Sequence, residues 1–152
     1  MHTTLATFVL MLLHGIASAG LLPEPERAQL TQRVLQAFWG KAINSAGGVI
    51  QPLDERDRNT VPITDSQVQF TIDVGEVSGL AEWCGLDWKP NFFALTRSFR
   101  ARGSPDKQVA FVGVLHGATQ GRIVAIMSSR HCGGPERAGV ERRLQDSLGR
   151  MR

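Results

Sequence analysis

The sequence predicts an all-α fold, a single-domain bundle of about five helices with one disulfide. Three observations predict it. Apolar residues recur at a helical period in most segments between the glycine- and proline-rich turns. The chain has two cysteines, an even count. Its first nineteen residues have the pattern of an export signal, and exported proteins are the ones in which disulfides form and persist.

The amino-terminal stretch predicts export. Leu5 to Leu13 form an apolar core, and the small-x-small pattern Ala17-Ser18-Ala19 follows it. We therefore expect a signal peptide over residues 1–19, cleavage after Ala19, a single helical domain over residues 20–152, and a periplasmic or secreted location. The residues before the apolar core include no Lys or Arg, only His2, so a buried N-terminal helix is the alternative.

The first helix of the domain is predicted over residues 26–44, because its apolar residues recur at helical spacing. These residues are Leu30, Val34, Leu35, Phe38 and Ala42. Asn44 and the small residues after it end the helix. The segment from Val49 to Ile63 holds two prolines and a charged run, which predicts a surface loop.

Residues 65–84 carry two competing patterns. Apolar and polar residues alternate strictly over 67–74, which is typical of a strand. The same segment also has an apolar helical face that continues for twenty residues, longer than a typical strand. Thr64 and Gln67 have the spacing of a capping box. We predict a helix, and an α+β fold with a strand at 67–74 is the alternative.

Proline and glycine signals delimit three further helices. Pro90 opens a helix that Gly103 ends. Ser104-Pro105-Asp106 then supplies an N-cap, a proline at the first helical position and an acid near the positive end of the helix dipole. That helix is expected to run to about Ser128, and the last one begins at Pro135-Glu136.

The two cysteines are predicted to form a disulfide. Cys84 ends one predicted helix, and Cys132 follows another that would return after an intervening antiparallel helix. Both sulfurs then reach the same end of the bundle, and closing the loop between them is worth ~4 kcal/mol in the chain-entropy model. A metal-binding or catalytic thiol is the alternative.

The charge is unevenly distributed along the domain. Residues 20–96 carry a net charge of −4 and residues 97–152 a net charge of +7, nearly all of it from arginine. A cationic half can favour nucleic acid, anionic lipid or an acidic protein partner. Because a solvated arginine-rich surface is the more common cause, we expect no specific nucleic-acid binding.

After residue 19 the sequence predicts no transmembrane anchor. It also contains none of the common catalytic motifs. The longest apolar stretch, Val109 to Ile126, is interrupted by glycines and polar residues. The chain has no G-x-S-x-G, H-E-x-x-H or Walker motif. Only two histidines, His116 and His131, follow residue 19, so neither a metal site nor a cofactor is predicted.

Three glycines recur at every fourth position of one predicted helix. We call Gly113, Gly117 and Gly121 the glycine ridge. Each costs roughly 1 kcal/mol relative to alanine in a helix, so we expect a compensating close approach of another helix. A homo-oligomer seam and a groove for a ligand are the alternatives.

His116 and Gln120 flank the glycine ridge. We expect His116 to be a hydrogen-bonded core residue, with Asp87, Glu82 or a backbone carbonyl as its partner. The functional alternative makes His116 a general base oriented by Asp87, with Gln120 as an auxiliary donor. No pattern in the sequence places a nucleophile for it.

Aromatic residues gather around Cys84. They are Trp83, Trp88, Phe92 and Phe93. A tryptophan next to a disulfide commonly packs on it as part of the core. An exposed part of this cluster would instead form a protein-binding surface with Arg97 and Arg100, since Trp and Arg dominate such sites.

These patterns predict an exported binding or accessory protein, an inhibitor or immunity-type module that contacts another protein or an anionic envelope polymer. Two alternatives are a small hydrolase that uses His116 and Asp87, and a structural homo-oligomer assembled through the glycine ridge. A concave pocket holding His116, Gln120 and a carboxylate would favour the hydrolase. A glycine ridge left uncovered in the monomer would favour the oligomer.

Overall fold

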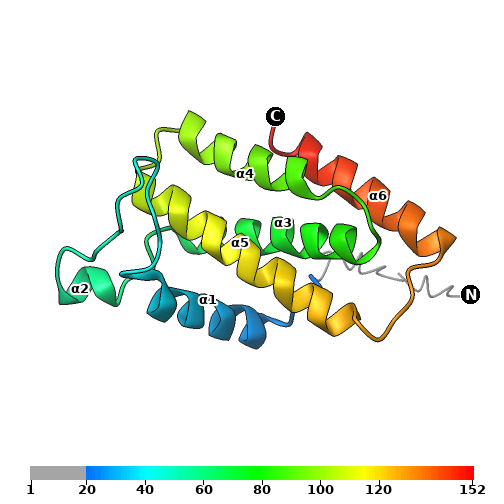
Figure 1. Cartoon of the computed structure of the whole chain (residues 1–152), viewed down its shortest axis with the longest axis horizontal. Coiled ribbons are helices and arrows are strands. Elements are labelled where there is room, and N and C mark those ends of the chain that lie inside the picture. The colour runs from blue at the N-terminus through cyan, green and yellow to red at the C-terminus, as the bar shows by residue number, and fades with distance from the viewer. Residues whose placement is uncertain (1–19) are drawn as a thin grey trace, which may run out of the picture.

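The computed structural model describes residues 20–152, which form an all-α bundle without a strand in that range (Figure 1). The predicted fold class is confirmed. The predicted signal peptide, residues 1–19, lies outside the described residues. The helices are α1 (Glu24–Phe38), α2 (Glu55–Arg58), α3 (Asp65–Trp83), α4 (Lys89–Ala101), α5 (Asp106–Met127) and α6 (Gly134–Gly149).

The two longest helices, α3 and α5, form the centre of the bundle and make the most extensive contact of any pair. Figure 1 shows α5 crossing in front of α3, with α1 on one side and with α4 and α6 on the other. The core fills the space between them. Its fully buried members include Phe38, Ile72, Leu95, Phe99, Phe111 and Leu115.

The segment with two competing patterns is helix α3, so the alternative of a strand at 67–74 is wrong. The predicted capping box is present: Thr64 Oγ1 accepts the Gln67 N–H at 3.3 Å, and Gln67 Oε1 accepts the Thr64 N–H at 2.9 Å. The other four long helices all contact α3. A helix surrounded in this way is apolar on several faces, which explains why its sequence also matches a strand pattern.

The first predicted helix is too long by six residues at its C-terminal end, because α1 ends at Phe38. Trp39 is extended and Gly40 has a positive φ of 75°, which turn the chain out of the helix. Ala42 keeps the helical spacing and is buried, but it packs from the loop, where its carbonyl accepts the Ile50 N–H at 2.9 Å.

The predicted surface loop contains one short helix that the sequence analysis missed. Helix α2 spans a single turn, and Asp54 caps it by accepting the Asp57 N–H at 2.7 Å. It therefore adds a sixth helix to the described bundle. Helix α5 begins one residue later than predicted: Pro105, not Ser104, is its N-cap, because the extended Pro105 carbonyl accepts the first helical N–H bonds.

The predicted disulfide is confirmed. Cys84 and Cys132 are bonded, with their Cα atoms 5.3 Å apart, inside the usual range for a disulfide. The bond joins the end of α3 to the connection between α5 and α6. We call this junction the disulfide corner. Two hydrogen bonds also stabilise it: the Trp83 indole donates to the Arg130 carbonyl at 3.0 Å, and the Arg137 guanidinium donates to the Cys84 carbonyl.

Candidate functional site

His116 lies in the core on the inner side of α5, with 1% of its surface exposed. Its Nε2 atom is 2.9 Å from the Ser78 hydroxyl of α3. The Trp88 and Phe92 rings cover it, with centroids 6.3 and 5.1 Å from the imidazole. Burial lowers the pKa of His116 to about 4, so the ring is neutral at physiological pH.

A buried polar network surrounds His116. The Asn91 side chain, from α4, donates to Ser78 Oγ at 2.9 Å and to the Val74 carbonyl at 3.1 Å. Since Ser78 Oγ accepts from Asn91, its own proton is available to His116 Nε2. The network thus ties α3, α4 and α5 together through neutral hydrogen bonds.

The structure does not assemble the predicted catalytic set. Asp87 is exposed, and its carboxylate accepts the Lys89 N–H at 3.1 Å. The Gln120 amide donates to the Glu82 carboxylate. His116 therefore has Ser78 as its partner, and neither predicted helper takes part in its hydrogen bond.

The pairing of Ser78 with His116 has the distance of a nucleophile and its base, but both residues are almost completely buried. A substrate has no access to them in this conformation. Sequence analysis missed Ser78 and Asn91. The available signal was a serine one turn after Val74, in the run Val77-Ser78-Gly79-Leu80-Ala81, whose other members have no polar side chain.

The four predicted binding residues do not form one patch. Trp83 packs beside the disulfide corner, whereas Trp88 is half-buried against His116. Arg97 is exposed and borders a shallow groove between α4 and α6. Arg100 is exposed and borders a second groove, next to the loop after α1.

The expectation that the glycine ridge packs against another helix is wrong for two of its three members. A Cβ built on Gly117 or Gly121 would meet no atom within 4 Å outside its own helix. A Cβ on Gly113 would make an ordinary contact with the Phe92 ring at 3.7 Å. The ridge faces outward because the inner side of α5 carries the larger core residues.

The close helix approach uses glycines of α3 instead. A Cβ on Gly75 would lie 2.7 Å from Thr119 Cβ and 3.0 Å from the His116 carbonyl oxygen. A Cβ on Gly79 would lie 2.6 Å from Ile123 Cβ. Both distances to Cβ atoms are far below van der Waals contact, so these two glycines let α3 and α5 pack backbone to backbone.

The outer side of α5, where two glycines of the ridge lie, is uncovered. We define the open face of α5 as four of its exposed residues that lie on one side of the helix, Val114, Gly117, Gly121 and Ala125. They are small or apolar, and they are spaced three or four residues apart. Arg122, the charged residue next to Gly121 in the chain, forms an ion pair with Glu26 of α1.

By length and composition alone, α5 could cross a membrane, and it is the one described helix that meets this test. Its inner side nevertheless belongs to the core, through residues such as Phe111, Leu115 and Ile123. The core helix of a soluble protein commonly combines these properties, so this result does not distinguish a membrane segment from a core helix.

Comparison with known proteins adds no function to this description. No protein-family model, no curated protein and no solved structure matches this chain. Among the described residues, no group of three or more His, Cys, Asp or Glu side chains is placed to hold a metal ion. We take the open face of α5 as the candidate site, because its residues are exposed and its glycines are not covered by another element.

Proposed function

We propose that this protein is an exported binding protein that takes a helix of another protein on the open face of α5. One observation carries the proposal: the face is exposed, uncharged and lined by glycines that no other element covers. Glycines at this spacing allow a second helix to approach the backbone closely. The disulfide supports export, since such bonds persist mainly in oxidising compartments.

The chemistry of the open face favours a helix over an envelope polymer. Anionic or polyhydroxylated polymers are recognised by cations and hydrogen-bond donors, and Val114, Gly117, Gly121 and Ala125 carry no polar side chain. The face extends for roughly 17 Å along α5, about three helical turns. A contact of that length buries a modest area, so we expect a weak, reversible complex.

The hydrolase alternative gains no support from the geometry. His116 is buried and neutral, and its predicted partner Asp87 lies in solvent. The network of His116, Ser78 and Asn91 instead serves the packing of three helices.

Self-association is the second candidate function, and the uncovered glycines favour it. A two-fold interface places identical surfaces together, so charged residues would repel one another there. The open face has no charge, and a row of small residues can pack against its own copy. The occupant would then be a second copy of this chain.

Site-specific photo-crosslinking in the native host tests both candidates. A photoreactive amino acid replaces Ala125 on the open face, and the matched control carries it at Gln32, which is exposed on α1. We expect a discrete adduct from position 125 only. An adduct of twice the chain mass identifies a second copy, and another discrete mass identifies a partner protein.

A charge on the open face should abolish the adduct. Gly117→Arg introduces a cation at a position whose Cβ would meet no other element within 4 Å, so the melting temperature should be unchanged or slightly higher while the crosslink from position 125 disappears. The proposal fails if position 125 gives no adduct, if position 32 gives the same adduct, or if Gly117→Arg leaves it intact.

A further inference from the structure

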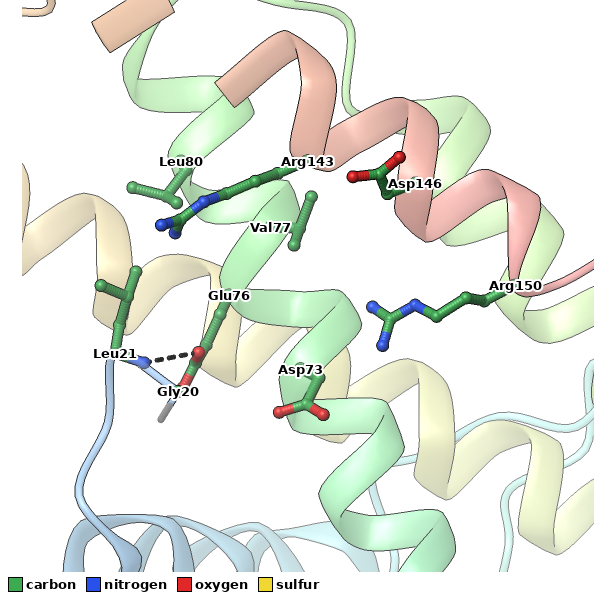
Figure 2. Close-up of a pocket in the computed structure, with 9 residues that line it drawn as sticks. All are labelled: Gly20, Leu21, Asp73, Glu76, Val77, Leu80, Arg143, Asp146 and Arg150. Carbon is green, nitrogen blue, oxygen red and sulfur yellow. Dashed lines mark hydrogen bonds between the residues drawn. The ribbon is translucent and has the colours of Figure 1, made fainter. Parts of the chain in front are cut away.

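A buried carboxylate holds the start of the described chain. Figure 2 shows a pocket between the N-terminal segment, α3 and α6, with Glu76 at the point where the segment meets α3. Glu76 is 5% exposed. Its two carboxylate oxygens accept the Leu21 N–H at 2.8 Å and the Leu22 N–H at 2.9 Å. The segment is therefore fixed by its backbone, directly after the predicted cleavage position.

The same site contains more negative than positive charge within ion-pair distance. Arg27 is 6% exposed and pairs with both Glu76 and Asp73, each at 2.8 Å. Its Nε atom also donates to the Leu22 carbonyl at 3.0 Å. Arg27 is the one described cation within ion-pair distance of either carboxylate, so two negative charges share one positive charge. The site favours a second cation.

Gly20 lies against these charged groups. A Cβ on Gly20 would be 1.7 Å from Arg27 Nη2 and 3.0 Å from Glu76 Oε2, so no larger residue fits without displacing Arg27. Since standard bond lengths place a backbone nitrogen within ~3 Å of its own Cβ position, the Gly20 nitrogen is at most ~6 Å from Glu76 Oε2.

We propose that this pocket is a binding site for the chain's own new amino terminus. Hydrolysis of the Ala19–Gly20 peptide bond by a signal peptidase consumes one water and leaves a carboxylate on Ala19 and an ammonium group on Gly20. That ammonium pairs with Glu76 and Asp73, for which Arg27 is otherwise the one described cation within ion-pair distance. The inference rests on the expected cleavage after Ala19 and is independent of the open face of α5.

Processing then adds a cation beside these two carboxylates. In the uncleaved chain the Gly20 nitrogen is a neutral amide and adds no charge to the site. Three charged residues of α6 face the same pocket: Arg143, Asp146 and Arg150 (Figure 2). The two arginines compete with the ammonium group for Asp73, whereas Asp146 reinforces its attraction. The buried pairing of Arg27 with Glu76 fixes the site that receives the terminus.

The test compares three chains of the same domain. One begins at Gly20 with a free amino group, the second is acetylated on that group, and the third begins at Ser18. All the described helices and the disulfide belong to residues 20–152, so each chain contains all of them. The measurements are the pKa of the Gly20 amino group by NMR titration and the urea midpoint between pH 6 and 10.

We expect the pKa of the Gly20 amino group to be at least ~1 unit above its ordinary value near 7.7, a tenfold gain in proton affinity. Because the folded-state pKa is raised, the added stability is complete below the unfolded-state pKa and is lost as the pH rises through the folded-state pKa. The free chain should therefore have the higher urea midpoint at pH 6.5, and this difference should shrink toward pH 10.

Matched variants assign the effect to the pocket. Asp73→Asn changes a carboxylate whose side chain is 40% exposed, so the fold should persist while the rise in the amino pKa becomes smaller. Asp146→Asn, on the far side of the pocket, should reduce this rise in the amino pKa by less than Asp73→Asn does. An ordinary amino pKa, equal midpoints for the free and acetylated chains, or a native amino terminus at another residue would each overturn the proposal.

Discussion

Two pairs of glycines, four residues apart in each pair, lie on the two central helices. Gly75 and Gly79 of α3 contact the backbone of α5, and any side chain there would overlap Thr119 or Ile123. Gly117 and Gly121 of α5 have open space around them. The same sequence spacing therefore marks a packed helix crossing in one helix and an uncovered surface in the other.

The position of each helix explains the difference. Helix α3 is surrounded by the other four long helices, so its glycines face a neighbour. Helix α5 packs on α3 with its inner side and leaves its outer side uncovered (Figure 1). The close approach offsets the cost of glycine in α3. Nothing in the described monomer offsets that cost at Gly117 and Gly121, which is why we assign their surface to binding.

The largest expected effect comes from filling the packed pair. Gly79→Leu should destabilise the protein by more than ~3 kcal/mol or prevent folding, because even its Cβ would lie 2.6 Å from Ile123 Cβ. Gly121→Leu is the matched control and should fold with unchanged or slightly higher stability. Urea denaturation of both variants measures this difference. Equal losses in the two variants would mean that the two glycine pairs have the same environment.

A second test uses pH to report on the inner side of α5. The pKa of His116 is lowered by burial to about 4, so only the unfolded chain binds a proton there between pH 6.5 and 4. Stability is therefore lost as the pH falls through this window, by about 3 kcal/mol in total from this group. Urea denaturation across the window measures the loss.

His116→Gln is the control for the pH effect. Glutamine cannot take up the proton, so the variant should lose less stability than the wild type between pH 6.5 and 4. An NMR titration that gives His116 an ordinary pKa near 6.5, or parallel pH profiles for the two proteins, would contradict its burial.

The smallest expected effect is a gain in the stability of the monomer. Gly117→Ala should stabilise the monomer by roughly 0.5–1 kcal/mol, because alanine is the better helix former and its methyl group meets no neighbour. Gly75→Ala is the matched variant on α3 and should lose stability, since its Cβ would lie 2.7 Å from Thr119 Cβ. Thermal unfolding separates the two. A loss of stability in Gly117→Ala would show that the open face is covered.

Local chemistry made most of the helix boundaries predictable. Apart from the end of α1, the predicted helix ends fall within two residues of the observed ones, because capping residues, prolines and glycines act within a single turn. The disulfide was also predictable, since alternating helix directions bring Cys84 and Cys132 to one end of the bundle. The predicted end of α1 was wrong because Ala42 has helical spacing but packs against the core from a loop.

The sequence by itself determined the five long helices, their order and the bridge between Cys84 and Cys132, because these depend on local backbone preferences and on chain direction. Tertiary structure alone decided which glycines are packed, which partner His116 has, and that Glu76 holds the chain near Gly20. Each of these depends on how a helix is rotated about its axis relative to distant segments. That rotation is set by the packing of the whole core, which no local pattern encodes.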